Sequence, residues 1–171
     1  MLVEYDPRWP ESFTLAAAEL SEIEPSWIVE HIGSTAIPGM AAKPAIDLAV
    51  RVGSFTEVED RFESLASLGW LRIARGPKAH RVLVRQEGPR RTDIAHFFTT
   101  EQWETCNQRI FRDWLLAHPQ DAARYLDVKR TAAEAATSMP DYTARKTAVV
   151  QDIVDRARAA RGLPLVDVWE T

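Results

Sequence analysis

Residues 30–52 read EHIGSTAIPGMAAKPAIDLAVRV, and we expect the rest of the chain to fold around this stretch. Residues 27–32 (WIVEHI) are rich in β-branched and aromatic side chains and predict a short strand. Gly33 follows at once, and a glycine there lets the backbone turn sharply and approach a ligand closely. A short helical turn and a second strand, at residues 45–52, complete the predicted unit.

The second strand of this unit alternates in polarity and carries one acid in its middle. Asp47 shares a face with Ala45, Ala49 and Arg51, whereas the residues between them are all aliphatic. A carboxylate in the middle of a strand needs a cation or hydrogen-bond donors. Asp47 is therefore the first candidate for a functional residue.

The unit as a whole predicts a site for phosphate and a metal ion. The backbone amides of a Gly-Ser turn that opens a helix form an anion site, and Ser34 and Thr35 add hydroxyl donors. Mg²⁺ prefers carboxylate and phosphate oxygens, which makes Asp47 its candidate ligand. The pattern is not the P-loop G-x-x-x-x-G-K-[ST], because five residues separate Gly33 from Gly39 and no lysine follows at once.

The composition is typical of a globular domain. The chain has 171 residues, of which 46% are hydrophobic and 27% charged, and its net charge is −4. We expect one domain at residues 1–162 and a tail at residues 163–171, as a monomer or a homodimer. The charge does not predict nucleic-acid binding, and no long apolar run predicts a membrane segment. One cysteine, Cys106, fits a reducing compartment, so we expect a cytoplasmic protein.

The remaining pattern predicts an α+β fold, with a small mixed sheet, packed helices and a helical C-terminal part. Pro10 is expected to begin a helix that ends near residue 23, and a capping box at Ser54 and Glu57 begins one that ends near residue 68. Strands are expected at residues 70–74, 80–86 and 91–98, and further helices at residues 101–117, 119–137 and 140–161. The tail is expected to dock on the body or on a second subunit through Leu165, Val166, Val168 and Trp169.

Two candidates lie on the strand at residues 91–98. Asp93 is either the second carboxylate of the site or an ordinary acid near the start of a strand. His96 lies on the other face of that strand and is either a hydrogen-bonded core residue or a site residue. Arg81 and Arg85 belong to the preceding strand, where they form either a solvated face or an edge that binds phosphate.

Basic residues also recur along the helical part. Charged residues on helices usually form solvated faces. Four of these residues are nevertheless candidates to face the expected phosphate and metal site and to bind phosphates there: Arg109, Arg112, Lys129 and Lys146.

Several of these motifs together resemble the GrpB family of the nucleotidyltransferase superfamily. The long string EHIGSTAIPGMAAKPAIDLAV is the most specific of them. The segments YDPRWP, FRDWLLAHP and DYTARK, together with Tyr125 and Lys129, extend the resemblance over nearly the whole chain. The resemblance implies a nucleotidyltransferase-like fold in which Gly33 and Ser34 hold phosphates.

The resemblance also implies a reaction, with one departure in the chain. In the superfamily, two acids at positions i and i+2 of a strand and a third acid on another strand bind two metal ions. Here Ala49 stands two residues after Asp47. Three hypotheses follow: Asp93, or Glu30 with it, supplies the missing ligand; one metal ion suffices together with Arg and Lys side chains; or the site binds a nucleotide without catalysis.

We therefore expect a metal-dependent nucleotidyltransferase that uses Mg²⁺, a nucleoside triphosphate and a small-molecule acceptor. The alternative is a non-catalytic module that binds a nucleotide or another phosphoester. The expected catalytic residues are Asp47, Asp93 and His96, and the expected metal ligands are Asp47, Asp93 and Glu30. The expected nucleotide- and phosphate-binding residues are His31, Gly33, Ser34, Thr35, Lys43, Arg81, Arg85, Arg112, Lys129 and Lys146.

Overall fold

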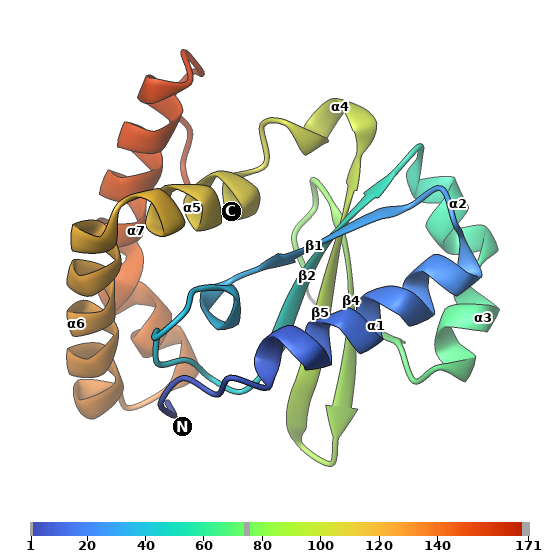
Figure 1. Ribbon diagram of the computed structural model, residues 1–171, viewed down its shortest axis with the longest axis horizontal. Coiled ribbons are helices and arrows are strands. Elements are labelled where there is room, and N and C mark those ends of the chain that lie inside the picture. The colour runs from blue at the N-terminus through green and yellow to red at the C-terminus, as the bar shows by residue number, and fades with distance from the viewer. Residues whose placement is uncertain (1, 74–75, 169–171) are drawn as a thin grey trace.

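A five-stranded mixed sheet lies at the centre of the computed structural model, which describes residues 2–73 and 76–168 (Figure 1). The strand order is β1-β2-β5-β4-β3. β2 and β5 are parallel, and the other neighbours are antiparallel. The strands are β1 (Ile28–Ile32), β2 (Ile46–Val52), β3 (Leu71–Arg72), β4 (Arg81–Glu87) and β5 (Arg90–Thr99).

Helices flank the sheet in two groups. In Figure 1, α2 and α3 stand at one side of the strands and α5, α6 and α7 gather at the other. The helices are α1 (Trp9–Ile23), α2 (Phe55–Asp60), α3 (Phe62–Ser67), α4 (Thr100–Trp103), α5 (Asn107–Ala117), α6 (Pro119–Ala135) and α7 (Met139–Ala160). A proline stands in the first turn of α1, α6 and α7, where its missing amide costs no hydrogen bond. The prediction of an α+β fold with a helical C-terminal part is confirmed.

The two faces of β2 have different neighbours. The aliphatic residues of β2 pack against α1, α2 and α3 in the larger hydrophobic core, as the alternation predicted. On the opposite face, Ala49 packs with Phe98 and with Trp103 of α4. Asp47 points to this second face as well, two residues nearer the start of the strand, because side chains alternate along a strand.

A second core joins the helical part to the loop between β1 and β2. Ile37 and Met40 of this loop pack with buried residues of α5, α6 and α7, among them Leu115 and Ile153. The loop is thus fixed between the sheet and the helices. The tail follows α7, and Val168 packs on the same core and donates its amide to Gln151. Leu165 and Val166 are exposed, so of these three residues only Val168 docks on the body as expected.

Two of the expected elements differ in the structure. The helix expected to end near residue 68 is divided into α2 and α3 at Arg61. The Ser54 side chain does not cap it, because the Glu57 carboxylate accepts from the amide of Gly53 and from Nε1 of Trp27. The expected strand at residues 70–74 is reduced to β3, and its last residue lies outside the described part of the chain. The same holds for residue 169 of the tail.

None of the helices within residues 2–73 and 76–168 combines the length and the apolar character needed to cross a bilayer.

Gly33 connects β1 to a short 3₁₀ helix, η1 (Ser34–Ala36), in a conformation that only glycine adopts readily. Its φ is 70° and its ψ is −173°. A Cβ at this position would lie 2.9 Å from both Cβ and Cγ of Asp47, and closer still to its Oδ2. The Asp47 carboxylate therefore lies directly against the Gly33 backbone, so the turn and the acid fit together only when residue 33 has no side chain.

We predict that Gly33→Ala lowers the free energy of unfolding more than Gly39→Ala. Both glycines have positive φ, 70° and 77°, but a Cβ at Gly39 would meet nothing within 4 Å. Gly39→Ala should therefore cost only the strain of the backbone, about 1–2 kcal/mol, and Gly33→Ala should cost the clash in addition. Urea unfolding measures both values. Adding Asp47→Ala to Gly33→Ala should recover part of the loss, whereas equal losses in the two single variants would contradict the contact.

Candidate functional site

Ser34 and Asp47 lie at one site because β1 and β2 are joined in register. Ile32, the last residue of β1, pairs with Asp47, so Gly33 and Ser34 follow beside the acid. The Asp47 side chain is 29% exposed, which leaves its carboxylate accessible. These two residues place a hydroxyl and a carboxylate on the same side of the sheet, toward the helical part.

Lys129 of α6 reaches this site from the helical part. Its side chain is buried, with 2% of the residue exposed. Its Nζ donates to Ser34 Oγ and to the Ala41 carbonyl oxygen, both at 2.7 Å. The pKa of Lys129 is lowered to about 7, chiefly by burial and to a lesser extent by the nearby Lys146, whereas Asp47 opposes the change. Both hydrogen-bond acceptors of the ammonium group are neutral oxygens, and an added anion would stabilise its charge.

Two further lysines meet at the ring of Tyr142. Lys43 Nζ lies 4.0 Å from the ring centroid and Lys146 Nζ lies 4.3 Å from it. Burial lowers the pKa of Lys146 to about 8, with a smaller contribution from Lys43, and burial also lowers the pKa of Lys43. Between the residues that the structure describes, neither lysine forms an ion pair with a carboxylate.

Lys43, Lys129 and Lys146 together form what we call the lysine cluster. All three act electrostatically on one another or on Asp47. Two of these lysines, Lys129 and Lys146, interact electrostatically with Asp47, whose carboxylate offsets only part of the lowering of their pKa values. Such a site favours a polyanionic ligand, which would restore the protonated form of each lysine.

His96 of β5 lies beside Asp47, and a second histidine supports it. His96 Nε2 is 3.9 Å from Asp47 Oδ1. His96 Nδ1 is 3.0 Å from Nε2 of His80, a buried residue that stacks on Phe98 at a centroid distance of 4.6 Å. His80 was not among the sequence candidates. The only feature of the sequence that could have pointed to His80 is its position near the start of β4, two residues before Val82, which pairs with His96 across the sheet.

The structure places Asp93 on the wrong face of the sheet for catalysis or metal binding at this site. Asp93 pairs with Ile46 in the parallel register, whereas Asp47 pairs with Ile94, and paired residues share a face. Asp93 therefore points toward α1, where its carboxylate accepts from Arg85 Nε at 3.1 Å. The prediction that Asp93 supplies the missing ligand is wrong.

Arg81 and Arg85 were expected to bind phosphate, and both also lie on that other face. Arg85 bridges Asp93 and Glu19 of α1. The guanidinium carbon of Arg81 lies 4.7 Å from the ring centroid of Phe55 in α2. These two predictions are wrong because alternation and register turn both side chains away from the lysine cluster.

Glu30 and Arg112 bind each other instead of a metal ion and a phosphate. The Glu30 carboxylate accepts from Arg112 and, at 3.0 Å, from Arg109, both on α5. Burial alone would raise the pKa of Glu30, but the two guanidinium groups outweigh it and hold this pKa below its usual value. Arg112 Nη1 also donates to the His31 carbonyl oxygen at 2.6 Å. The network fastens α5 to β1, which corrects both predictions.

His31 and Thr35 support the Gly-Ser turn from behind. His31 Nε2 and Thr35 Oγ1 are 2.9 Å apart, and the imidazole stacks on Phe13 of α1 at a centroid distance of 4.7 Å. Burial lowers the pKa of His31 to about 4, which keeps the ring neutral. Thr35 is buried, and the His31 ring is held between the Thr35 hydroxyl and the Phe13 ring, so both side chains are engaged within the fold. The structure therefore reassigns both from binding to the support of the turn.

The donors at the site fit one divalent cation shared with a ligand, but not a preformed two-metal centre. Across residues 2–73 and 76–168, no group of three or more His, Cys, Asp or Glu side chains is arranged to hold a metal ion. Asp47 provides a carboxylate, and Mg²⁺ is commonly held by one or two carboxylates together with substrate phosphates. The fit therefore depends on phosphate oxygens from a bound ligand.

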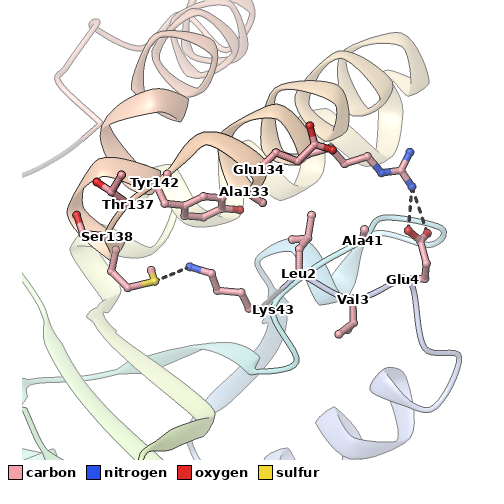
Figure 2. Close-up of a pocket in the computed structure, with 13 residues that line it drawn as sticks. Leu2, Val3, Glu4, Ala41, Lys43, Ala133, Glu134, Thr137, Ser138 and Tyr142 are labelled. Atoms are coloured by element: carbon pink, nitrogen blue, oxygen red, sulfur yellow. Dashed lines mark hydrogen bonds and ion pairs between the residues drawn. The ribbon is translucent and has the colours of Figure 1, made fainter.

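A cavity of about 610 Å³ adjoins the lysine cluster. Figure 2 shows Lys43 reaching from the loop toward the helical wall that carries Tyr142. Leu2 and Val3 of the N-terminal segment also line the cavity, and Glu134 lines it from α6. The lining combines apolar and charged side chains. Lys43 belongs to both the cavity and the lysine cluster, and Tyr142, whose ring contacts Lys43 and Lys146, also lines the cavity.

Comparison with known proteins agrees with this geometry. The family model described as GrpB protein matches residues 1–156. A UPF0157 protein of Halalkalibacterium halodurans is 36% identical over 164 residues, which cover 92% of this chain and 82% of that protein. The crystal structure of the conserved protein GrpB from Enterococcus faecalis matches with a TM-score of 0.85 and 29% identity, over 95% of this chain and 99% of that one.

A more distant likeness concerns the fold alone. Terminal uridylyl transferase 4 from Trypanosoma brucei, solved with bound dUTP, matches with a TM-score of 0.58 and 13% identity, over 98% of this chain and 60% of that one. The five-stranded mixed sheet and its helices therefore form a nucleotidyltransferase fold. With the family match over most of its length, the chain belongs to the GrpB family.

Proposed function

We propose that this protein is a nucleotidyltransferase that moves a nucleoside monophosphate from a nucleoside triphosphate to a small acceptor. The observation that carries the proposal is the lysine cluster, which brings positive charge beside Ser34 and Asp47 that the Asp47 carboxylate offsets only in part. A triphosphate supplies the negative charge that this arrangement lacks. The nucleotidyltransferase fold makes nucleotidyl transfer the reaction that best fits such a ligand.

The lysine cluster also suits the transition state of this reaction. In nucleotidyl transfer the acceptor attacks the α-phosphorus and pyrophosphate leaves, so negative charge develops on the leaving group. Fixed cations lower the energy of that charge without having to reorganise. Lys129 is positioned by Ser34 and Ala41 before any ligand arrives. We assign Lys129 and Lys146 to the phosphates of the substrate.

Asp47 is the residue that would hold a divalent cation, together with phosphate oxygens. When bound, such a cation neutralises charge on the phosphates and on the leaving pyrophosphate. Because Ala49 replaces the second acid of the superfamily pattern, the protein offers less carboxylate to metal ions. The cationic side chains accordingly carry a larger share of the stabilisation.

The cavity beside the cluster supports a small-molecule acceptor. Its volume of about 610 Å³ lies within the range of about 300–1,000 Å³ that is usual for small-ligand pockets. Lys43 and Tyr142 connect it to the phosphate side of the site. The net charge of −4 also makes a small acceptor a better fit than a nucleic acid.

A second candidate function is a binding module without catalysis. The observation that favours it is the small number of metal ligands. Asp47 supplies one carboxylate, and no group of three or more metal-ligating side chains occurs in the described ranges 2–73 and 76–168. Such a module would bind the same nucleotide through the same lysines and would release no pyrophosphate.

We predict that Asp47→Asn lowers pyrophosphate release at least about tenfold, whereas Asp93→Asn retains it. The two acids lie on neighbouring strands but on opposite faces of the sheet, which makes Asp93 a matched control. Asp93→Asn should instead lower the melting temperature, because Arg85 loses a partially buried ion pair. Pyrophosphate release is measured for each of the four ribonucleoside triphosphates with a panel of hydroxyl, amine and phosphate acceptors, and with a short RNA.

The outcomes of this assay separate the alternatives. Release with RNA alone would replace the small acceptor by a nucleic acid. Tight nucleotide binding with no release for any acceptor would favour the binding module. Equal release by the wild type and Asp47→Asn would show that the assigned site is not the active site.

A further inference from the structure

Ala49, which stands where the superfamily pattern has its second acid, has a histidine as its neighbour on the adjacent strand. Ala49 stands at the i+2 position from Asp47, and its partner in the parallel pairing of β2 and β5 is His96. Paired residues share a face of the sheet, so the His96 imidazole and the Asp47 carboxylate lie on the same side. An imidazole nitrogen therefore lies beside the methyl group of Ala49, where the superfamily pattern has a carboxylate.

The distance between the His96 and Asp47 side chains fits a shared metal ion better than a direct hydrogen bond. His96 Nε2 lies 3.9 Å from Asp47 Oδ1, which is too long for a hydrogen bond. Two ligands that each lie about 2.0–2.2 Å from one metal ion are separated by roughly 3–4 Å. Both side chains are accessible from the site, with 18% of the His96 side chain and 29% of the Asp47 side chain exposed.

The other side of the His96 ring has the partner that a metal-bound histidine needs. Metal-ligating histidines almost always donate their second ring N–H to a fixed acceptor, which sets the tautomer and the orientation of the ring. His96 Nδ1 lies 3.0 Å from His80 Nε2. His80 is 4% exposed and stacks on Phe98, so it is itself held in place. If His96 donates to His80, the lone pair on its Nε2 faces Asp47.

We propose that Asp47 and His96 bind one divalent transition-metal ion, with His80 as the positioning residue behind His96. A ligand pair of one carboxylate and one imidazole favours ions such as Mn²⁺, Co²⁺ or Zn²⁺ over Mg²⁺, which prefers oxygen ligands. The remaining positions are filled by phosphate oxygens of the triphosphate, so the inference rests on the proposed function. It also changes the expected metal ion from Mg²⁺ to a transition metal.

The lysine cluster determines when this ion binds. Lys129 and Lys146 place positive charge near Asp47 and therefore repel a metal ion when no anionic ligand is bound. A triphosphate removes this repulsion and adds its own oxygens. We therefore expect strong metal binding only in the presence of the nucleotide.

The test is pulsed EPR of Mn²⁺ bound to the full chain with each of the four non-hydrolysable ribonucleoside triphosphate analogues. We expect a ¹⁴N coupling from a directly bound imidazole in the wild type. His96→Asn should abolish this coupling and weaken Mn²⁺ binding about 10–100-fold, while the analogue still binds. His96→Gln serves as a second variant, and circular dichroism confirms that each variant is folded.

Two other histidines sharpen the test. His80→Asn should weaken Mn²⁺ binding, because the His96 ring loses the partner that orients it. His118→Asn is the matched control, because His118 is exposed at the end of α5 and should leave both the coupling and the affinity unchanged.

The possible failures are distinguishable. An analogue that binds with Mn²⁺ but without ¹⁴N coupling, or with a coupling that persists in His96→Asn and His96→Gln, overturns the metal inference and leaves the proposed function intact. If no analogue binds, the proposed function fails. The same spectra are then recorded with saturating Mn²⁺ and inorganic triphosphate, which supplies the phosphate oxygens without a nucleoside. A coupling that His96→Asn removes would support the metal pair, and its absence would overturn it.

Discussion

The burial of the Lys129 ammonium group between Ser34 and Ala41 is the interaction on which the site depends. A buried ammonium group whose hydrogen-bond acceptors are neutral oxygens is costly, and the pKa of Lys129 falls to about 7 as a result. Its two hydrogen bonds tie α6 to the loop between β1 and β2. Ile37 and Met40 of the same loop pack into the helical core, so polar and apolar contacts hold the loop in one position.

A second constraint comes from the sheet. The Asp47 carboxylate lies against the Gly33 backbone, which fixes the acid relative to the turn that precedes η1. The parallel register of β2 and β5 then decides which residues of β5 share its face. It brings His96 beside Ala49 and sends Asp93 to the side of α1. The site thus has one carboxylate, one imidazole and three lysines, instead of three carboxylates.

The parts of this structure that follow from local patterns were predictable from the sequence. The alternation of β2 correctly placed Asp47 opposite the aliphatic residues, and the glycine and the hydroxyl residue after β1 correctly indicated a sharp turn into a short helix. The prolines correctly indicated where α1, α6 and α7 begin. In each case the signal lies within a few residues of the feature that it predicts.

The remaining parts depend on contacts between distant segments. The face occupied by Asp93 follows from the register of β2 against β5, which the sequence of either strand alone does not determine. The pairing of Glu30 with Arg109 and Arg112 joins residues about 80 positions apart. Lys43 and Lys146 become neighbours only because both reach Tyr142. Side-chain chemistry identified candidates, but only the tertiary structure distinguishes binding from support.

If the phosphates of a nucleotide occupy the lysine cluster, binding must change the protonation of the lysines, and this change can be measured as proton uptake. The pKa values of Lys129 and Lys146 in the free protein are about 7 and about 8. At about pH 8.5 a large part of each is neutral, and neighbouring phosphates raise both pKa values, so binding must take up protons.

Calorimetric titration with a triphosphate analogue, in buffers of different ionisation enthalpy, measures this uptake. We expect net uptake of protons near about pH 8.5. This uptake should decline toward about pH 6, where both lysines are already protonated, and should be smaller in Lys129→Met. A heat of binding that is the same in all buffers, or an uptake unchanged in Lys129→Met, would show that the phosphates bind elsewhere.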